Sequence, residues 1–187
     1  MQSAVPKGEG GMLAILGSDL IKIEKIIEEN KNKYKCFIAN DNSEGQVVAS
    51  GKINDIDKFA SDLKSNNIKN IKLPVSAPFH CQLMSKATEI MKNEIEKLSF
   101  HNSKNKLISN VTAKEIKNEE ELKILLINQI ENRVRWREIV IKMIDNGVNN
   151  FIEIGPGKVL SGLVKRINKT VNISSINSET DIKELKI

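Results

Sequence analysis

The chain has 187 residues, of which 40% are hydrophobic and 28% are charged, and its formal net charge at pH 7 is +5. This composition is enough to bury a core in one or two globular domains, and no apolar run reaches the roughly eighteen residues of a membrane span. The first residues show neither a basic segment followed by an apolar run nor a cleavage signal, so we expect a cytoplasmic protein without membrane association.

Two cysteines and two histidines are too few, and too far apart, to predict a metal site. The lysines are interspersed with acidic residues, which is typical of a solvated surface and argues against a nucleic-acid interface. Arg133, Arg135 and Arg137 flank Trp136 in a small basic and aromatic cluster. This cluster predicts either contact with an acidic partner or a helix start with the indole in the core.

Residues 12–76 predict the order strand, helix, strand, strand, helix, strand. The strands are expected at 12–16, 35–39, 46–50 and 71–75, a turn at 40–45, and helices after Asp19 and after Asn54 or Asp55. This order is that of the ferredoxin-like βαββαβ arrangement, in which both helices cover one face of an antiparallel sheet.

The rest of the chain predicts a different kind of sheet. Helices are expected at about 82–98, 119–129 and 136–146 and within 156–167, with strands at 106–112, 151–155 and 171–176. This alternation indicates a parallel α/β sheet, although three strands are fewer than such sheets usually contain. We therefore expect a small ferredoxin-like subdomain at 11–76 and part of an α/β domain at 77–187.

The segment LPVSAPFHCQLM, residues 73–84, contains the first candidate for chemistry, His80. Pro74 and Pro78 favour extended backbone before them and a helical pattern follows Cys81, so His80 is predicted where a strand ends and a helix begins. An imidazole held there suits proton transfer near neutral pH, whereas a capping, packing or exposed role is the alternative. A dyad of His80 with Cys81 is disfavoured because neighbouring helical residues point in different directions, and the chain has no G-x-S-x-G elbow.

Two further positions are weaker candidates. The turn EIGPGKVLSGL, residues 153–163, predicts a strand followed by a glycine loop and a helix whose free amides would suit an anion. Its alternative is a tight turn whose glycines serve packing, since it matches neither a Walker A loop nor GxGxxG. Gln129 lies at the predicted end of a helix, and its spacing alone indicates no function.

Five segments together carry a resemblance that none carries alone: ANDNSEGQVVASG, PVSAPFHCQLM, LISNVTA, NQIENRVRWRE and FIEIGPGKVLSGLVKRI. In order and spacing they resemble the carboxy-terminal part of the malonyl-CoA:acyl carrier protein transacylase (malonyltransferase) family, over essentially the whole chain. The resemblance implies a hydrolase-like parallel α/β domain into which a ferredoxin-like subdomain is inserted. Residues 77–187 would then be the carboxy-terminal part of that large acyltransferase domain.

The resemblance also implies roles for individual residues. His80, in the PFH motif, matches the general base of the family, and Gln129 matches a glutamine beside it, where a backbone carbonyl helps to hold the imidazole. Asn40 and Asn42 match positions near the acyl pocket. Ser76 lies in the stretch leading to the base. Like Asn40 and Asn42, it is assigned to substrate binding.

Several family features lie before the point where the resemblance begins: the serine of a GHSLGE-type elbow, a GQGSQ-type oxyanion loop and the arginine that binds the malonyl carboxylate. We therefore expect a carboxy-terminal fragment, inactive by itself, of an enzyme that moves malonyl from CoA to the phosphopantetheine thiol of acyl carrier protein. The expected partners are acyl carrier protein, malonyl-CoA and a separate amino-terminal half that supplies the serine, with no cofactor. The alternatives are an inactive remnant or a carrier-protein-binding module; RNA binding is disfavoured because residues 46–50 offer no aromatic platform.

Overall fold

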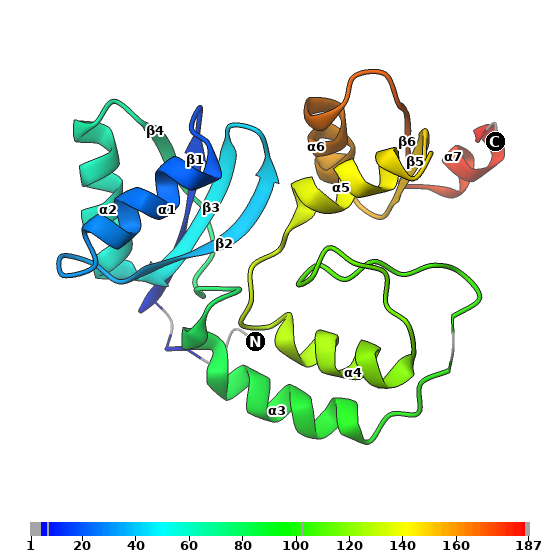
Figure 1. Ribbon diagram of the computed structural model, residues 1–187, viewed down its shortest axis with the longest axis horizontal. Helices are drawn as coiled ribbons and strands as arrows, with labels where there is room; N and C mark the ends of the chain where they lie inside the picture. The colour runs from blue at the N-terminus through cyan, green and yellow to red at the C-terminus, as the bar shows by residue number, and fades with distance from the viewer. Residues whose placement is uncertain (1–4, 7, 102, 186–187) are drawn as a thin grey trace.

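Two sheets of different kinds organise the structure, a computed structural model that describes residues 5–6, 8–101 and 103–185 (Figure 1). The elements in chain order are β1 (Gly10–Leu16), α1 (Leu20–Glu29), β2 (Cys36–Ser43), β3 (Gln46–Lys52), α2 (Ile53–Ser65), β4 (Lys69–Lys72), η2 (Gln82–Met84), α3 (Ser85–Glu96), α4 (Glu119–Asn128), α5 (Trp136–Asp145), β5 (Asn150–Ile154), α6 (Val159–Ile167), β6 (Asn172–Ile176) and α7 (Glu179–Glu184). None of the helices in these ranges is both long and apolar enough to cross a bilayer.

The first sheet confirms the ferredoxin-like prediction. Its four strands pair antiparallel in the order β2-β3-β1-β4, so β1 and β3 are central. Helices α1 and α2 cover one face of this sheet (Figure 1). Leu13 and Ile15 of β1 meet Ile23 of α1 and Phe59 of α2 in the main core, and all four side chains are fully buried. The alternation of apolar residues in β1 places the neighbours of Leu13 on the opposite face.

That opposite face is covered by the segment that follows β4. Met12, Ala39 and Val48, from three neighbouring strands, form a buried cluster against which Leu73 and Phe79 pack. Phe79 also packs on a second buried cluster, which includes Ala87 of α3 and Ile130 after α4. The residue just before His80 therefore joins the sheet to the helices α3 and α4.

Gly10 allows this segment to approach the sheet closely. A Cβ atom built on Gly10 would lie 2.8 Å from the backbone nitrogen of Pro78, closer than real Cβ atoms come to such an atom. Pro78 is itself fully buried. Only glycine therefore lets β1 contact the main chain two residues before His80.

The helix starts of this subdomain follow the predictions in part. The carboxylate of Asp19 accepts a hydrogen bond from the amide of Lys22 at 2.8 Å, which confirms Asp19 as the cap of α1. The predicted start of α2 at Asn54 or Asp55 is wrong, because the helix begins at Ile53 without a side-chain cap. The amide of Ile53 donates instead to the carbonyl of Glu9 at 2.8 Å.

The predicted turn at 40–45 is also largely wrong, since β2 continues to Ser43 and the turn is confined to Glu44 and Gly45. Two irregularities in the pairing with β3 accommodate the polar residues of β2. The outer edge of β2 also gains backbone hydrogen bonds to Val134, which accepts from Asp41 and donates to Ala39. These tertiary contacts extend the strand beyond its local preference.

The strand predicted at 106–112 is wrong as well. Only an isolated bridge joins Ile108 to Glu115, and the chain between them forms a turn. The Ser109 hydroxyl accepts a hydrogen bond from the amide of Val111 at 3.1 Å. This side chain takes the place of the carbonyl that a neighbouring strand would otherwise offer to the amide. The helix predicted at 82–98 is present as η2 and the slightly shorter α3.

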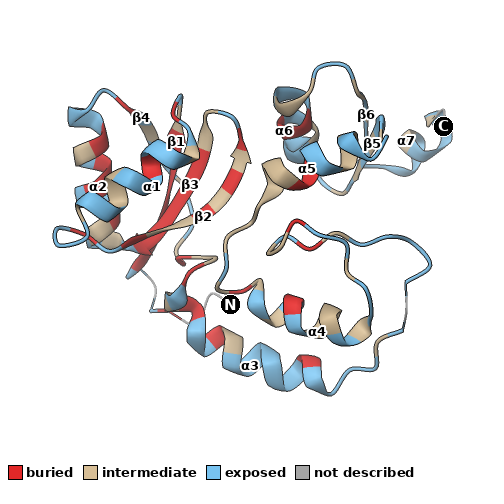
Figure 2. Cartoon of the chain, in the orientation of Figure 1, coloured by how far each residue is buried: buried red, intermediate tan, exposed pale blue. Residues whose placement is uncertain are grey.

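The second sheet is a parallel pair of β5 and β6, with Phe151 opposite Ile173 and Ile154 opposite Ile176. Helix α5 ends as predicted at Gly147, which has a φ of 89° and lets the amides of Gly147 and Val148 bond back to the last turn. Figure 2 shows that buried residues concentrate in the antiparallel sheet and its helices, whereas β5, β6 and α7 are largely exposed or half-buried.

Substituting Gly10 tests the close approach of Pro78. We expect Gly10→Ala to lower the free energy of unfolding by about 1–3 kcal/mol, because the new methyl group meets backbone that cannot move independently. Gly11→Ala is the matched control, since the one close contact of its Cβ would be the flexible Cδ1 end of Ile53, at 2.9 Å, and the next atoms lie at 3.8 and 3.9 Å. Urea denaturation of both variants measures the difference, and equal losses would contradict the argument.

Candidate active site

His80 lies in a turn between β4 and η2. The predicted junction is therefore correct on its helical side, but the strand has already ended at Lys72. The backbone of His80 has a φ of 60°, in the left-handed region that residues with a side chain seldom adopt. This conformation costs on the order of 1 kcal/mol. It persists because Phe79 packs on the sheet immediately before it and Cys81 is buried immediately after it.

The imidazole of His80 is held by Gln129, 49 positions away in the sequence. Its Nδ1 lies 3.0 Å from the backbone carbonyl oxygen of Gln129. A carbonyl oxygen can only accept, so the proton of the neutral ring is on Nδ1 and Nε2 keeps its lone pair. The side-chain nitrogen of Gln129 lies 3.3 Å from the same Nδ1. Because that Nδ1 already carries a proton, the side-chain nitrogen donates to the backbone carbonyl of Asn132, also at 3.3 Å.

The position of Gln129 explains why its carbonyl is available. Gln129 is the C-terminal cap of α4, where backbone carbonyls lack partners within the helix. The same helix end carries the negative pole of the α4 dipole. It lies beside the imidazole of His80, which it contacts through the carbonyl of Gln129.

A cavity of about 500 Å³ opens beside His80. It lies between α1, β2 and the loop after α4, and its lining residues are Glu24, Phe37, Ile38, His80, Cys81, Gln82, Glu131, Asn132 and Arg133. Two carboxylates, Glu24 and Glu131, thus share the cavity with the imidazole. Sequence reasoning missed both, because acidic residues on a helix face or in a loop give no local signal.

Cys81 is not a second reactive group. Its thiol is buried and donates to the carbonyl of Pro78 at 3.1 Å. Burial raises the pKa of the Cys81 thiol and raises that of Cys36 to about 12. Both cysteines are free thiols that stay protonated at neutral pH.

The three residues expected at the substrate do not line this cavity. Asn40 and Asn42 are half-buried residues of β2, and Ser76 is half-buried in the segment before Pro78. Asn40 pairs with Val48 in the sheet register and therefore shares the face on which Phe79 packs. No side-chain hydrogen bond of these three residues occurs within the described ranges, and none of them is among the lining residues of the cavity.

The arginine cluster is engaged by carboxylates. Arg137 binds both oxygens of Asp41 through its Nε, at 3.1 and 3.0 Å, and Asp41 is fully buried. Arg133 pairs with Glu24 at 2.6 Å and Arg135 with Glu138 at 2.5 Å. Hydrogen bonding to Asp41 raises the pKa of Arg137. The cluster begins α5 and ties it to β2, which supports the predicted helix start, whereas Trp136 is half-buried and lies outside the core clusters.

The glycine turn already holds an anionic group of its own. The carboxylate of Glu153 accepts from the amides of Leu160 at 3.0 Å and Ser161 at 2.7 Å, at the start of α6. Hydrogen bonds from Ser161, and then from Leu160, hold the pKa of Glu153 below its usual range. External anion binding is therefore disfavoured, and the tight-turn alternative is supported only in its turn: Gly155 and Gly157 have φ of 138° and 91°, whereas a Cβ at either would meet nothing within 4 Å, so these glycines do not serve packing.

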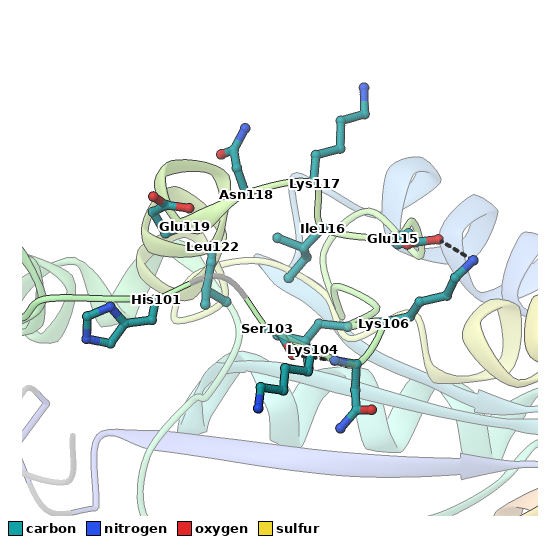
Figure 3. A pocket seen from close by; sticks show the side chains of 12 residues that line it. His101, Ser103, Lys104, Lys106, Glu115, Ile116, Lys117, Asn118, Glu119 and Leu122 are labelled. Carbon is teal, nitrogen blue, oxygen red and sulfur yellow. Dashed lines mark hydrogen bonds and ion pairs between the residues drawn. The ribbon is translucent and has the colours of Figure 1, made fainter.

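A second cavity, of about 250 Å³, lies between the loop at 103–107 and the start of α4 (Figure 3). Three lysines line it, and one of them, Lys106, pairs with Glu115 at 3.3 Å. Figure 3 shows Lys117 and Lys104 extending in opposite directions, so their charges do not converge on one point. None of the residues expected at the site from the sequence lines it.

The fold and the histidine site together define a class. Residues 1–185 match the family model described as the acyl transferase domain. The malonyl CoA-acyl carrier protein transacylase of Bacillus subtilis (strain 168) is 38% identical over 184 residues, which are 97% of this chain and 58% of that protein.

Solved structures agree with this match. The crystal structure of malonyl CoA-acyl carrier protein transacylase from Clostridium perfringens is 38% identical and aligns with a TM-score of 0.93, over 98% of this chain and 58% of that one. A complex of a type II PKS acyl-carrier protein with its malonyl-transacylase contains a chain that is 33% identical, with a TM-score of 0.91 over 97% of this chain and 59% of that one. The chain belongs to the acyl transferase domain family and spans about 58% of the length of the curated transacylases that it matches.

The buried carboxylate of Asp41 gives a stability prediction. We expect Arg137→Ala to lower the free energy of unfolding at pH 7 by about 2–4 kcal/mol, because it leaves a buried charge without its partner. Arg133→Ala, which removes a half-exposed pair with Glu24, should cost less than about 1 kcal/mol. Urea denaturation separates the two, and similar losses would show that Asp41 does not depend on Arg137.

The lowered pKa of Glu153 gives a prediction on pH. Its contribution to stability is fully present above the usual carboxyl range, near 4.3, and is lost as the pH falls through the lower folded value. We therefore expect wild type to be more stable than Glu153→Gln at pH 7 and the difference to shrink below about pH 4. Thermal unfolding from pH 3 to 7 measures this, and a difference independent of pH would contradict it.

Proposed function

We propose that this chain is the base-carrying part of a malonyltransferase, with His80 as general base for a serine located outside it. The assembled enzyme would move malonyl from CoA to the phosphopantetheine thiol of acyl carrier protein, in fatty acid synthesis in the cytoplasm. The observation that carries the proposal is the hydrogen bond of His80 Nδ1 to the Gln129 carbonyl, which leaves Nε2 free to accept a proton. The malonyl substrate and the carrier protein are those for which the related malonyl transacylases are named.

The proposed reaction has two halves. Nε2 of His80 removes the serine hydroxyl proton as the serine oxygen attacks the malonyl thioester carbonyl, and the C–S bond then breaks while the imidazolium returns the proton to the CoA sulfur. In the second half the carrier thiol gives its proton to Nε2 and attacks the malonyl-serine ester. The C–O bond breaks and the serine regains a proton from the imidazolium.

Gln129 serves this cycle as a positioning residue. Its carbonyl keeps the Nδ1 proton in place, so the ring always presents the same nitrogen to the serine. Because the main chain provides the contact, a change in the Gln129 side chain should cost less activity than loss of the imidazole.

For Asn40, Asn42 and Ser76 we propose contact with the acyl group or its pantetheine arm. Their side chains are half-buried and have no hydrogen-bond partner within the described ranges, so they are available to a ligand. Asn40 also lies on the sheet face against which the residue before His80 packs. These features support a place near the substrate in the assembled enzyme.

The alternative is an inactive remnant or a module that binds carrier protein without transferring malonyl. The acyl-carrier protein complex among the related structures favours binding as its activity. The two functions differ in one measurement. Carrier binding that weakens with salt, without malonyl transfer when the serine-bearing part is present, would support the module.

The direct test combines this chain with the part of the Bacillus subtilis relative that the match leaves out. We expect no malonyl-protein from this chain alone and transfer from malonyl-CoA to holo acyl carrier protein once the two are combined. His80→Ala should lower kcat by roughly 10²–10⁴-fold, since general-base catalysis contributes about that much. Transfer of radiolabelled malonyl is the measurement.

His101→Ala is the matched control, because it removes the other histidine, an exposed one, and should leave the rate unchanged. Gln129→Ala should lower kcat less than His80→Ala does. An assembled, folded complex in which His80→Ala transfers malonyl as fast as wild type would refute the role of His80.

A further inference from the structure

Asp41 joins the two parts of the candidate site. In the sequence it lies between Asn40 and Asn42, which are expected at the substrate. Its backbone amide donates to the carbonyl of Val134 at 2.9 Å, and Val134 belongs to the loop after α4. That loop begins at Gln129, whose carbonyl holds the imidazole of the candidate base. One residue therefore links the strand of the two asparagines to the loop that holds the base.

The side chain of Asp41 makes a second connection in the same place. Both carboxylate oxygens accept hydrogen bonds from Nε of Arg137, at 3.1 and 3.0 Å, and Nη2 of Arg137 lies 2.9 Å from Oδ2. Arg137 is in the first turn of α5, three residues after Val134. The end of the loop is thus fastened to β2 by two backbone hydrogen bonds of Val134 and by this ion pair.

The charge of Asp41 is unusual for its position. Among the residues that the structure describes, Asp41 is the only buried side chain that carries a charge, and it is 1% exposed. A buried ion pair is a poor source of stability because both ions lose hydration, and a well-packed apolar pair is often at least as stable. What the ion pair adds is direction, since its hydrogen bonds fix the distance and angle between α5 and β2, whereas apolar contacts are non-directional.

We propose that Asp41 and Arg137 are positioning residues, which hold the loop of Gln129 and the strand of Asn40 and Asn42 as one rigid unit. The base then keeps a constant distance from the bound acyl group. A displacement of about 1 Å between reacting groups can lower a rate on the order of 100-fold. The inference rests on the proposed function in one respect, since that function assigns the base and the substrate contacts; the hold on the loop is a property of this chain alone.

The first measurement uses this chain by itself. The proton on Nδ1 of His80 gives a downfield NMR signal while its hydrogen bond to Gln129 protects it from exchange with water. We expect Asp41→Leu combined with Arg137→Met to raise the exchange rate of this proton roughly tenfold, because the loop is no longer held in one place. The free energy of unfolding in urea should stay at or above that of wild type, since neither ion is left unpaired.

Asp41→Asn is the conservative variant. Its side-chain oxygen still accepts a hydrogen bond from Arg137, so the exchange rate of the Nδ1 proton should change less than about threefold. The matched control is Arg135→Met combined with Glu138→Leu. It removes the neighbouring ion pair, in which Nε of Arg135 lies 2.8 Å from Oε1 of Glu138, and should leave the exchange rate unchanged because this pair lies at the start of α5 without a carboxylate of β2.

The second measurement uses the enzyme assembled with the unmatched part of the Bacillus subtilis relative. The apolar pair at positions 41 and 137 should lower kcat roughly 10- to 100-fold and change KM less than about threefold, because the substrate still binds but the base is misplaced. A pair that served stability alone would change neither constant in a folded variant. The control pair at positions 135 and 138 should transfer malonyl at the wild-type rate.

Three results would overturn the proposal. The Nδ1 proton of His80 could exchange at the wild-type rate in the folded apolar variant, or exchange equally fast in the control pair. The apolar variant could also fail to fold, in which case Asp41 and Arg137 serve stability and not position. If the exchange rate rises as expected but the wild-type assembled enzyme transfers no malonyl, the proposed function is wrong and the hold on the loop stands.

Discussion

The site depends on how the second face of the antiparallel sheet is covered. Helices α1 and α2 occupy only one face, and the other bears the buried side chains of Met12, Ala39 and Val48, which need an apolar cover. The chain leaving β4 provides that cover with Leu73 and Phe79. His80 is therefore positioned by the packing that completes the core of the subdomain, and the geometry of the base and the stability of the sheet are linked.

Most of the fold was predictable from apolar periodicity and turn residues. The six elements from β1 to β4 occur in the expected order because each strand and helix buries one face, which leaves a regular pattern in the sequence. The errors lie where hydrogen bonds from elsewhere outweigh local preference. Val134 extends β2 through residues that favour a turn, the carbonyl of Glu9 starts α2, and the Ser109 hydroxyl replaces a strand partner.

The site was less accessible to sequence reasoning. Local pattern singled out His80, but its contact with Gln129 spans 49 positions, and only the resemblance to a family indicated it. The roles of Gly10 and Glu24 depend on which elements meet in space, so no spacing along the chain indicates them. The choice between anion binding and a tight turn at residues 153–163 was open for a related reason: the carboxylate that accepts from the first amides of α6 comes from the preceding strand.

The left-handed backbone of His80 also limits which residues can replace the histidine at this position. A residue with a side chain is strained at a φ of 60°, whereas glycine adopts that conformation freely and asparagine does so more easily than most residues. Selection for stability alone would therefore favour glycine or asparagine at this position. Histidine enters this region more readily than most residues, as asparagine does, so the left-handed turn and the imidazole are compatible at this position, whereas a β-branched residue would be strained there.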